Sequence, residues 1–189
     1  MHKITAIIPT GNEIHNIEAV IASVDFADEI LVVDSFSTDG TYEKAQELAT
    51  KVIRRKYQYS ASQKNWAIPQ ATHEWILLVD ADERVITELK EEIIHILSQP
   101  KQEHDAYWIG RINHFMGERV HYSGWRNDSV IRLFKRDLCK YEDKHVHAEI
   151  IVQGTVGHLK NKLYHNTYIT FDKYLEKMNR YAWWQAKDY

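Results

Sequence analysis

WILLVDADERV, at residues 75–85, runs from five apolar residues into three carboxylates, those of Asp80, Asp82 and Glu83. A short apolar run of this length predicts a buried strand. Alternate residues of an extended segment share a face, so the carboxylates of Asp80 and Asp82 can point toward a common cation. Oxygen ligands at such a strand end suit Mg²⁺ or Mn²⁺, which take their remaining ligands from water and substrate phosphates. A strand end that merely meets solvent also acquires charged residues, and this stretch alone does not separate the two interpretations.

The same letters occur in another kind of site. Phosphatases of the haloacid dehalogenase type also have an apolar strand that ends in Asp-x-Asp-x, followed by Thr or Val; their first Asp attacks phosphate and the second acts as acid and base. Here Arg84 follows Glu83, so that pattern fails at its last position. We therefore favour the metal interpretation.

The first half of the chain alternates short apolar runs with helical patterns. These patterns predict strands at 4–9, 29–34, 51–55 and 75–80, and helices at 12–24 (with Asn12 as a possible cap), 41–50, 60–72 and 86–99. Strands joined by helices imply right-handed crossovers and a mostly parallel sheet, whose ligands bind beyond the carboxyl ends of the strands. The segments 9–13, 34–40 and 80–83 should therefore lie along one edge and form the candidate site.

The second half has a different character. Residues 105–137 and 147–168 alternate apolar and polar residues with period two, which is typical of antiparallel strands. The segment from 170 onward predicts an amphipathic helix that reaches the last residue without a stop signal, which suggests a truncated C-terminus. We expect one α/β domain over 1–189, with a nucleotide-binding half at 1–100 and an acceptor half at 101–189.

Composition excludes several classes of protein. The 189 residues are 44% hydrophobic and 27% charged, as in ordinary globular proteins, and the net charge of −3 gives no global basic field for binding nucleic acid. A single cysteine, Cys139, cannot form an internal disulfide, which fits a reducing cytoplasm. No stretch of roughly 18 apolar residues predicts a membrane span. Peripheral contact with the inner face of the cytoplasmic membrane remains open.

Two further strand ends agree with the carboxylate motif. IIPTGNE (7–13), VVDSFSTDGT (32–41) and the Asp-Ala-Asp of 80–82 occur in order and at fitting spacing. Together they resemble the nucleotide-sugar half of glycosyltransferase family 2, over residues 4–83. The resemblance implies the GT-A fold, a Rossmann-like mixed sheet with helices on both faces, and a nucleoside diphosphate sugar as donor, with a UDP-sugar favoured.

The resemblance also implies roles for single residues. It places Pro9, Thr10 and Glu13 in the nucleoside pocket, Asp34 at the uracil or ribose, Lys64 and Asn65 near the nucleotide, Asp80 toward the ribose, and Asp82 on the metal. Lys64 has the charge to meet a phosphate. Ser35 stands where many relatives have a second acid, which leaves the contact with the base open. Asp34 has an alternative role as a turn cap, and Thr38 and Asp39 are better suited to capping the next helix.

The second half carries a narrower resemblance, to bacterial glycosyltransferases that build lipopolysaccharide core, including those that place glucose on a heptose. GWRNDSVIRLFKRD (124–137) and the segment from 145 onward keep family positions, which are Gly124, Trp125, Asp128, Arg132, Leu133, Phe134, His147, His165, Lys177, Asn179, Arg180 and Tyr181. Ala148 replaces the usual Glu after His147. Glu149 follows one place later and cannot be assumed to substitute, because a shift of one residue reverses the face of a strand.

An inverting transfer needs a base for the acceptor hydroxyl and a counter-charge for the leaving diphosphate. Asp128 is the candidate base, since it follows Trp125, an aromatic that can stack on a sugar; a salt bridge of Asp128 to Arg126 or Arg132 is the alternative. The metal, with Arg132 or Lys135, would hold the leaving group. Either His147 or His165 could add a metal ligand beside Asp82, although a purely structural histidine is the commoner case.

The predicted function is a metal-dependent, inverting transfer of a hexose, glucose by resemblance, to lipopolysaccharide core or another cell-envelope glycan or glycolipid. Two alternatives remain: a catalytically silent protein that binds nucleotide sugars, and a sugar nucleotidyltransferase, whose Gly-rich, Lys-containing phosphate loop is missing after the first strand. In the terminal helix, tryptophans and bases could dock at a membrane face, or serve as core or oligomer contacts; they are Trp183, Trp184, Lys173, Lys177, Arg180 and Lys187.

Overall fold

The computed structural model describes residues 2–122, 124–145, 148–168 and 170–187. The first half contains β1 (Ile4–Thr10), α1 (Ile14–Ser23), β2 (Glu29–Asp34), α2 (Thr41–Leu48), β3 (Lys51–Arg54), α3 (Ser60–Ala67), the short 3-10 helix η1 (Ile68–Gln70), β4 (Trp75–Leu78), β5 (Glu83–Arg84) and α4 (Thr87–Ser98). The second half contains β6 (Ala106–Phe115), β7 (Glu118–Arg119), η2 (Gly124–Asn127), β8 (Ser129–Lys135), η3 (Arg136–Leu138), β9 (Cys139–Tyr141), β10 (Ile150–Val152), β11 (Val156–Tyr168) and α5 (Phe171–Lys187).

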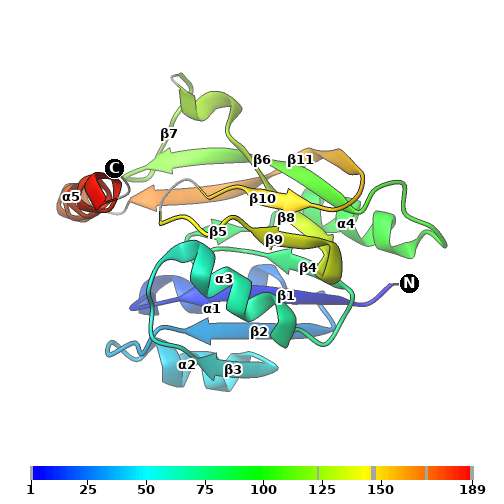
Figure 1. Ribbon diagram of the computed structural model, residues 1–189, viewed down its shortest axis with the longest axis horizontal. Coiled ribbons are helices and arrows are strands. Elements are labelled where there is room, and N and C mark those ends of the chain that lie inside the picture. Colours follow the sequence, from blue (N-terminus) through cyan, green and yellow to red (C-terminus); the bar gives the residue numbers. More distant parts are fainter. Residues whose placement is uncertain (1, 123, 146–147, 169, 188–189) are drawn as a thin grey trace.

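One mixed sheet runs through the molecule in the order β3-β2-β1-β4-β8-β6-β11-β5, with β7 paired to β6 (Figure 1). Strands β3, β2, β1 and β4 are all parallel, as the alternation of strands and helices predicts. Their side chains are almost all buried in β1, β2 and β4, which is expected of strands covered on both faces. The predicted α/β fold with a mostly parallel first half is confirmed.

The second half departs from the antiparallel prediction at one pair of strands. Strand β8 runs antiparallel to both β4 and β6, but β11 runs parallel to β6. After β8 returns along β6, the separate β9–β10 hairpin reverses the chain again, so that β11 starts at the same end of the sheet as β6. Alternation of polar and apolar residues indicates strands but not their direction, which explains the difference.

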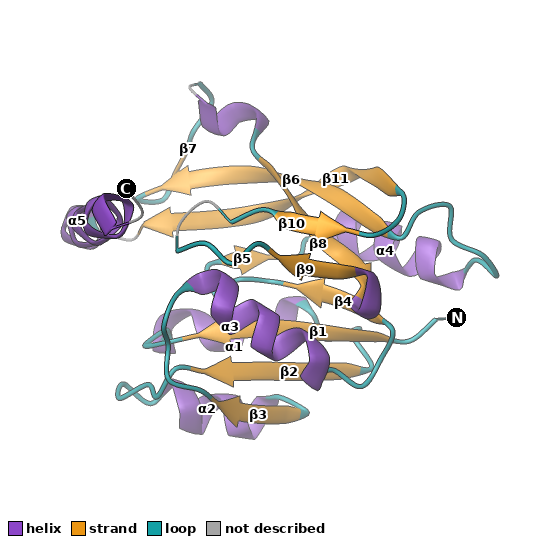
Figure 2. Ribbon diagram, in the orientation of Figure 1, coloured by secondary structure: helices purple, strands orange, loops and turns teal. Residues whose placement is uncertain are grey.

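Alternate residues of the central strands pack into two separate hydrophobic cores, one on each face of the sheet. Ile8 packs on one face with the buried sides of α1 and α4, whereas Ile7 packs on the other face with α3, η1 and β9. Helices therefore cover both faces of the sheet, and the β9–β10 hairpin covers part of the second face (Figure 2). In this view β1, β2, β6 and β11 all point toward the side where α5 lies, so their carboxyl ends and α5 meet at one edge.

The segments 9–13 and 34–41, at the carboxyl ends of β1 and β2, are hydrogen-bonded to each other. Asn12 has a left-handed φ of 55° and does not cap α1; its side-chain oxygen accepts from the backbone N–H of Thr38 at 2.8 Å. The N–H group of Ile14, the first residue of α1, instead donates to Asp39 of the 34–41 segment at 3.1 Å. Asp39 also accepts from the backbone N–H of Thr41 at 3.0 Å, at the start of α2, although the N-cap position of that helix is Gly40 and not Asp39. The 9–13 and 34–41 segments thus form one rigid wall of the sheet edge.

Candidate functional site

A cavity of about 590 Å³, here named the strand-end cavity, lies at the carboxyl ends of the strands. Seven of the ten residues predicted for the site line it: Pro9, Thr10, Glu13, Lys64, Asp80, Asp82 and His165. Segments 9–13 and 80–82 meet there as predicted, joined by α3, β11 and α5. The other three predicted residues, Asp34, Asn65 and Asp128, are not part of its lining.

The acidic turn and His165 are brought together by a short strand pair. Strand β5, directly after the turn, pairs antiparallel with β11, so that Glu83 faces His165 in the register. The backbone N–H of Asn166 also donates to the carbonyl of Asp82 at 2.9 Å. As a result His165 Nε2 lies 3.5 Å from Asp82 Oδ2, across 83 positions of sequence.

Hydrogen bonds to Asn113 determine which nitrogen of His165 carries the proton. Asn113 Nδ2 donates to the carbonyl of Trp125 at 2.9 Å and to Asp128 at 3.1 Å, which leaves its Oδ1 as an acceptor. His165 Nδ1 lies 2.6 Å from that oxygen and must donate to it. The lone pair of a neutral imidazole is then on Nε2 and faces a carboxylate oxygen of Asp82, an arrangement that a shared cation stabilises.

This pair fits a divalent cation that keeps much of its coordination for other molecules. Among the residues that the structure describes, no group of three or more His, Cys, Asp or Glu side chains gathers as a complete protein site. Mg²⁺ and Mn²⁺ sites commonly use one or two protein ligands and take the rest from water and substrate phosphates. Asp82 and His165 match that pattern. His147, the other predicted candidate, lies outside the described residues.

Glu83 and Asp80 belong to an ionic network beneath the strand-end cavity. Glu83 is fully buried and accepts from Arg132 at 2.8 and 3.1 Å and from the backbone of Asp80 at 3.0 Å. Asp80 pairs with Lys64 at 2.9 Å and also with Arg132. The third carboxylate of the turn therefore has a structural role: it holds the buried arginine that in turn positions Asp80.

Charge around Asp80 decides its protonation. Burial by itself would raise the pKa of the Asp80 carboxyl, but the positive charges of Arg132 and Lys64 outweigh it and hold that pKa well below its usual range. Glu13, on the opposite wall, has a pKa raised by burial, with the hydrogen bond from Asn16 acting against the rise. Asp80 is thus an ionised, fully paired group rather than an open ligand.

Replacing Asp80 by Asn should lower the free energy of unfolding by about 2 kcal/mol at neutral pH, less than the 3–5 kcal/mol typical of a fully buried pair because the side chain is 31% exposed. A carboxyl whose folded-state pKa is depressed adds stability above its unfolded pKa and loses it as pH falls. The difference between the two proteins should therefore shrink below about pH 4. Urea unfolding at several pH values measures it. Asp25→Asn, at a surface pair with Lys90, is the matched control and should change little; a pH-independent difference for Asp80→Asn would contradict the assignment.

Two residues predicted to contact the nucleotide, Asp34 and Asn65, form hydrogen bonds with other protein groups. Asp34 is fully buried, accepts from the backbone N–H of Ser37 at 3.1 and 3.3 Å, and pairs with Arg54 at 3.2 Å. That is the turn-capping role, and the nucleoside role of Asp34 stays a prediction. Asn65 is bound on both sides to the backbone of Tyr141, at 2.7 and 2.9 Å, so it fastens α3 to β9.

Asp128 lies one hydrogen bond behind the strand-end cavity. Its Oδ2 is 2.6 Å from Arg111 Nη2, and Arg111 itself lines the cavity. Burial would raise the pKa of Asp128, but the hydrogen bond and charge of Arg111 lower it, so the group is ionised at neutral pH. The alternative of an ion pair is thus realised, but with Arg111 and not with the expected Arg126 or Arg132.

The predicted leaving-group cations are placed elsewhere. Arg132 is only 3% exposed and lies in the network with Glu83, and Lys135 pairs with Asp105 at 2.8 Å. The cations that line the strand-end cavity besides Lys64 and Arg111 come from α5, and they are Lys177 and Arg180. Burial by itself would lower the pKa of Lys177, but the charges of Tyr181 and Asp82 outweigh burial and raise that pKa above its usual value, so Lys177 is charged. Neither α5 cation has an ion pair with a carboxylate among the described residues.

Two buried polar atoms of the cavity wall lack partners within the described chain, which makes them candidates for contact with a ligand. They are Thr10 Oγ1 and Gln63 Oε1, in side chains that are 5% and 2% exposed. Gln63 Nε2 donates to Ser35 Oγ at 3.3 Å. Sequence reasoning missed Gln63, Arg111, Tyr57 and Tyr168, because no local pattern distinguishes them from ordinary surface or core residues. Tyr181, which also lines the cavity, matched a family position but received no role in the site.

A parallel nucleotide-type half, an Asp-x-Asp turn beside a histidine and a cavity rich in cations define a glycosyltransferase of the GT-A class. The sequence profile described as "Glycosyl transferase family 2" matches residues 5–157, and the chain belongs to that family.

Named relatives agree with this family. The chain is 33% identical over 198 residues to an uncharacterized glycosyltransferase of Rickettsia bellii, which covers 98% of this chain and 67% of the relative. It is 28% identical over 186 residues to the lipopolysaccharide core biosynthesis glycosyltransferase LpsC of Rhizobium meliloti, covering 95% of this chain and 68% of LpsC. The chain thus spans about two thirds of the length of these relatives.

Solved structures share the fold. S. aureus TarS 1-349 in complex with UDP-GlcNAc superposes with a TM-score of 0.62 at 18% identity, covering 88% of this chain and 59% of that one. The complex of the same fragment with UDP gives a TM-score of 0.61, covering 87% of this chain and 60% of that one. The chain spans less than two thirds of these proteins, and at this identity the likeness establishes the GT-A fold.

Proposed function

We propose that the chain transfers a hexose, glucose in the favoured case, from a UDP-sugar to a glycan or glycolipid acceptor of the cell envelope, with inversion and with a divalent cation. One observation carries the proposal: Asp82 and His165, from distant segments, face each other at 3.5 Å in a cavity that also holds Lys177 and Arg180, two cations without a carboxylate partner among the described residues. That combination suits a nucleoside diphosphate with its metal ion better than it suits a neutral ligand.

The donor would lie along the wall formed by segments 9–13 and α3. The unpartnered oxygens of Thr10 and Gln63 offer hydrogen bonds to the nucleoside, beside Pro9 and Glu13. Asp82 and His165 would hold Mg²⁺ or Mn²⁺, which neutralises developing charge on the diphosphate. Lys177 and Arg180 lie in the same cavity without carboxylate partners among the described residues, and we assign them to the departing diphosphate.

The chemical step would be a single displacement. The acceptor hydroxyl oxygen forms a bond to the anomeric carbon while the bond from that carbon to the diphosphate oxygen breaks. The hydroxyl proton passes to the carboxylate of Asp128, and the diphosphate leaves with the electron pair of the broken bond. Arg111 keeps Asp128 ionised and oriented before the step.

The acceptor class follows from the relatives. LpsC is named for lipopolysaccharide core biosynthesis, so we propose a lipopolysaccharide core or similar envelope acceptor. Of the helices described, none is long and apolar enough to cross a bilayer. We propose a cytoplasmic location with peripheral contact at the membrane through α5, where Trp183 is 72% exposed.

A thermal-shift screen of nucleotide sugars, with and without Mn²⁺, tests the donor assignment. At a given concentration, a ligand that binds only the native state raises the melting temperature more the tighter it binds, so UDP-sugars with Mn²⁺ should give the largest rise. Turnover is then followed with the labelled sugar that binds best. Transfer or slow hydrolysis supports the enzyme. Binding without either, also in a longer version of the chain, indicates a silent binder, and release of pyrophosphate from a nucleoside triphosphate and a sugar phosphate indicates a nucleotidyltransferase.

A further inference from the structure

A second cavity, of about 510 Å³, lies beside the first and is here named the basic cavity. It is formed by β6, the β7 segment, η2 and β11, and its basic residues are Arg111, Arg119, His121, Arg126 and Lys162. No Asp or Glu occurs among the described residues that line it. The whole chain has a net charge of −3, so this concentration of positive charge is local and not a consequence of composition.

Three of these cations lack the counter-charges that other cations of the chain have. Lys64, Arg132 and Lys135 each pair with a carboxylate. Arg119, Arg126 and Lys162 have no ion pair within the described ranges, and all three side chains are exposed toward solvent. Like charges gathered in one concave site repel each other, and a bound anion removes that repulsion.

Backbone geometry directs these side chains into the cavity. A Cβ at Gly110 would lie 3.1 Å from both Cγ and Cε of Lys162, so the lysine stem lies directly over this glycine of β6. Arg119 follows a tight turn at Met116 and Gly117, where φ is 53° and 87°. The backbone N–H of Val120 then donates to the carbonyl of Asn113 at 2.8 Å, which fixes the β7 segment against β6.

The basic cavity adjoins the proposed base. Arg111 lines both cavities and holds Asp128 at 2.6 Å, and Asn127, directly before Asp128, is part of the basic wall. Trp125, which is 36% exposed, also lines it, and an aromatic ring at this place can stack on a sugar. A sugar held here would lie beside the segment that carries Asp128, which borders the basic cavity through Asn127 and Arg111.

We propose that the basic cavity binds a phosphate group carried by the acceptor sugar, with Arg119, Arg126 and Lys162 as its ligands. The inference rests on the proposed glycosyltransferase function, which supplies the need for an acceptor. Three unpaired cations match the double negative charge of a phosphomonoester better than the single charge of a carboxylate, and arginine presents paired N–H donors to phosphate oxygens. The enzyme would thus select phosphorylated glycan acceptors over neutral ones.

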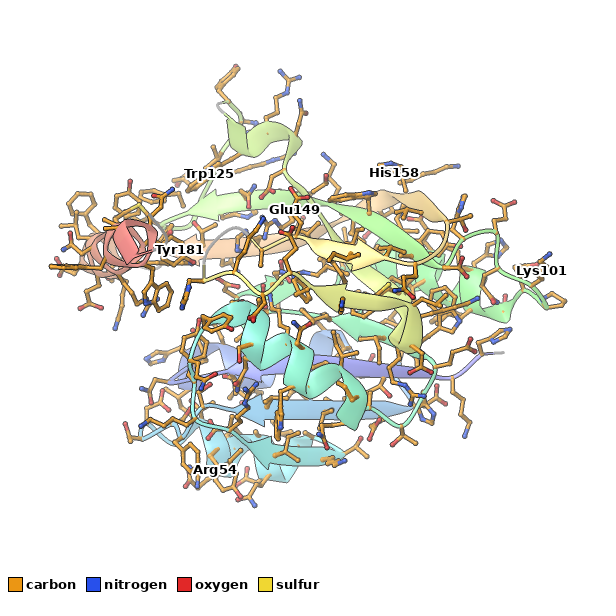
Figure 3. All side chains as sticks on the ribbon, in the orientation of Figure 1. Arg54, Lys101, Trp125, Glu149, His158 and Tyr181 are labelled. Carbon is orange, nitrogen blue, oxygen red and sulfur yellow. The ribbon has the colours of Figure 1, made fainter. Side chains whose placement is uncertain are left out.

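Three compounds with the same hexose ring but different charge test the proposal by chemical-shift titration of the ¹⁵N-labelled chain: glucose 6-phosphate, glucuronate and glucose. The phosphate should bind most tightly. Arg126→Ala combined with Lys162→Ala should weaken its binding by about tenfold or more, the loss of two charge-assisted contacts. Lys101→Ala combined with Lys160→Ala removes the same charge from exposed positions outside the basic cavity and should change nothing; Lys101 lies at the far end of the molecule from Trp125 (Figure 3).

UDP in the same samples separates this inference from the proposed function. Both double variants should bind UDP as the unaltered chain does, and saturating UDP should not displace glucose 6-phosphate. Displacement by UDP would place the phosphate in the strand-end cavity and overturn the proposal, as would equal affinity for glucuronate or for the Arg126/Lys162 variant. A chain that binds glucose 6-phosphate as expected but never binds UDP would instead contradict the glycosyltransferase function.

Discussion

Replacing Asp128 by Asn should lower the rate of sugar transfer by about a thousandfold while leaving UDP affinity unchanged, because a positioned general base contributes roughly 10²–10⁴ in rate. Asn preserves the shape of the side chain and its contact with Asn113 but cannot accept a proton at neutral pH. Arg111 retains a second partner, Glu83, at 3.4 Å, so the fold should be little affected. Turnover of labelled donor, with UDP affinity measured separately, tests this.

The pH profile adds an independent check on Asp128. Because Arg111 lowers the pKa of Asp128, the carboxylate should stay ionised below about pH 4. On the acid side of the pH profile, the transfer rate should therefore drop only at a pH below the ordinary pKa of an Asp side chain. Asp137→Asn is the matched control, since Asp137 also pairs with an arginine but is 73% exposed and lines neither cavity. Normal turnover of Asp128→Asn would remove Asp128 from the mechanism.

The parts of the fold that local sequence determines were predictable. Apolar runs predicted β1, β2, β3 and β4, and the rule that ligands bind at carboxyl ends of parallel strands placed segments 9–13 and 80–83 in one site. Strand ends were less accurate, since β4 stops at Leu78, two residues before the predicted end. Period-two alternation predicted strands in the second half but could not give the parallel pairing of β6 and β11.

The parts of the site that depend on distant pairings were not predictable from pattern. Glu83 had no assigned role, because its partners Arg132 and Arg111 are 49 and 28 positions away. Lys177 and Arg180 matched family positions, and the helical pattern left membrane, core and oligomer contacts open for them, yet both line the strand-end cavity. His165 was proposed only through the family resemblance, and the β5–β11 pairing that brings it to Asp82 has no signal in either segment alone.

Replacing Asp82 by Ala should remove the dependence of UDP affinity on Mn²⁺. In the unaltered chain Mn²⁺ should tighten UDP binding, because Asp82 and His165 each supply a ligand while the diphosphate supplies others. Loss of a residue that only supports a metal ligand lowers metal affinity roughly 10–100-fold. Loss of a direct ligand such as Asp82 should lower it at least as much. Calorimetric titration of UDP with and without Mn²⁺ measures this, and the paramagnetic effect of Mn²⁺ on water relaxation reports metal binding without any turnover.

The histidine distinguishes a metal site from a simple ion pair. If the 3.5 Å contact were only a salt bridge between Asp82 and a protonated His165, Mn²⁺ would leave UDP affinity unchanged in every variant, and the metal assignment would be wrong. If both residues hold the cation, His165→Ala should lose Mn²⁺ dependence as Asp82→Ala does. His158→Ala, on the same strand but stacked against Trp108 outside the strand-end cavity, should keep it. Asn113→Ala should fall between these results, because it frees the His165 ring to rotate and lose the proton position that points Nε2 at Asp82.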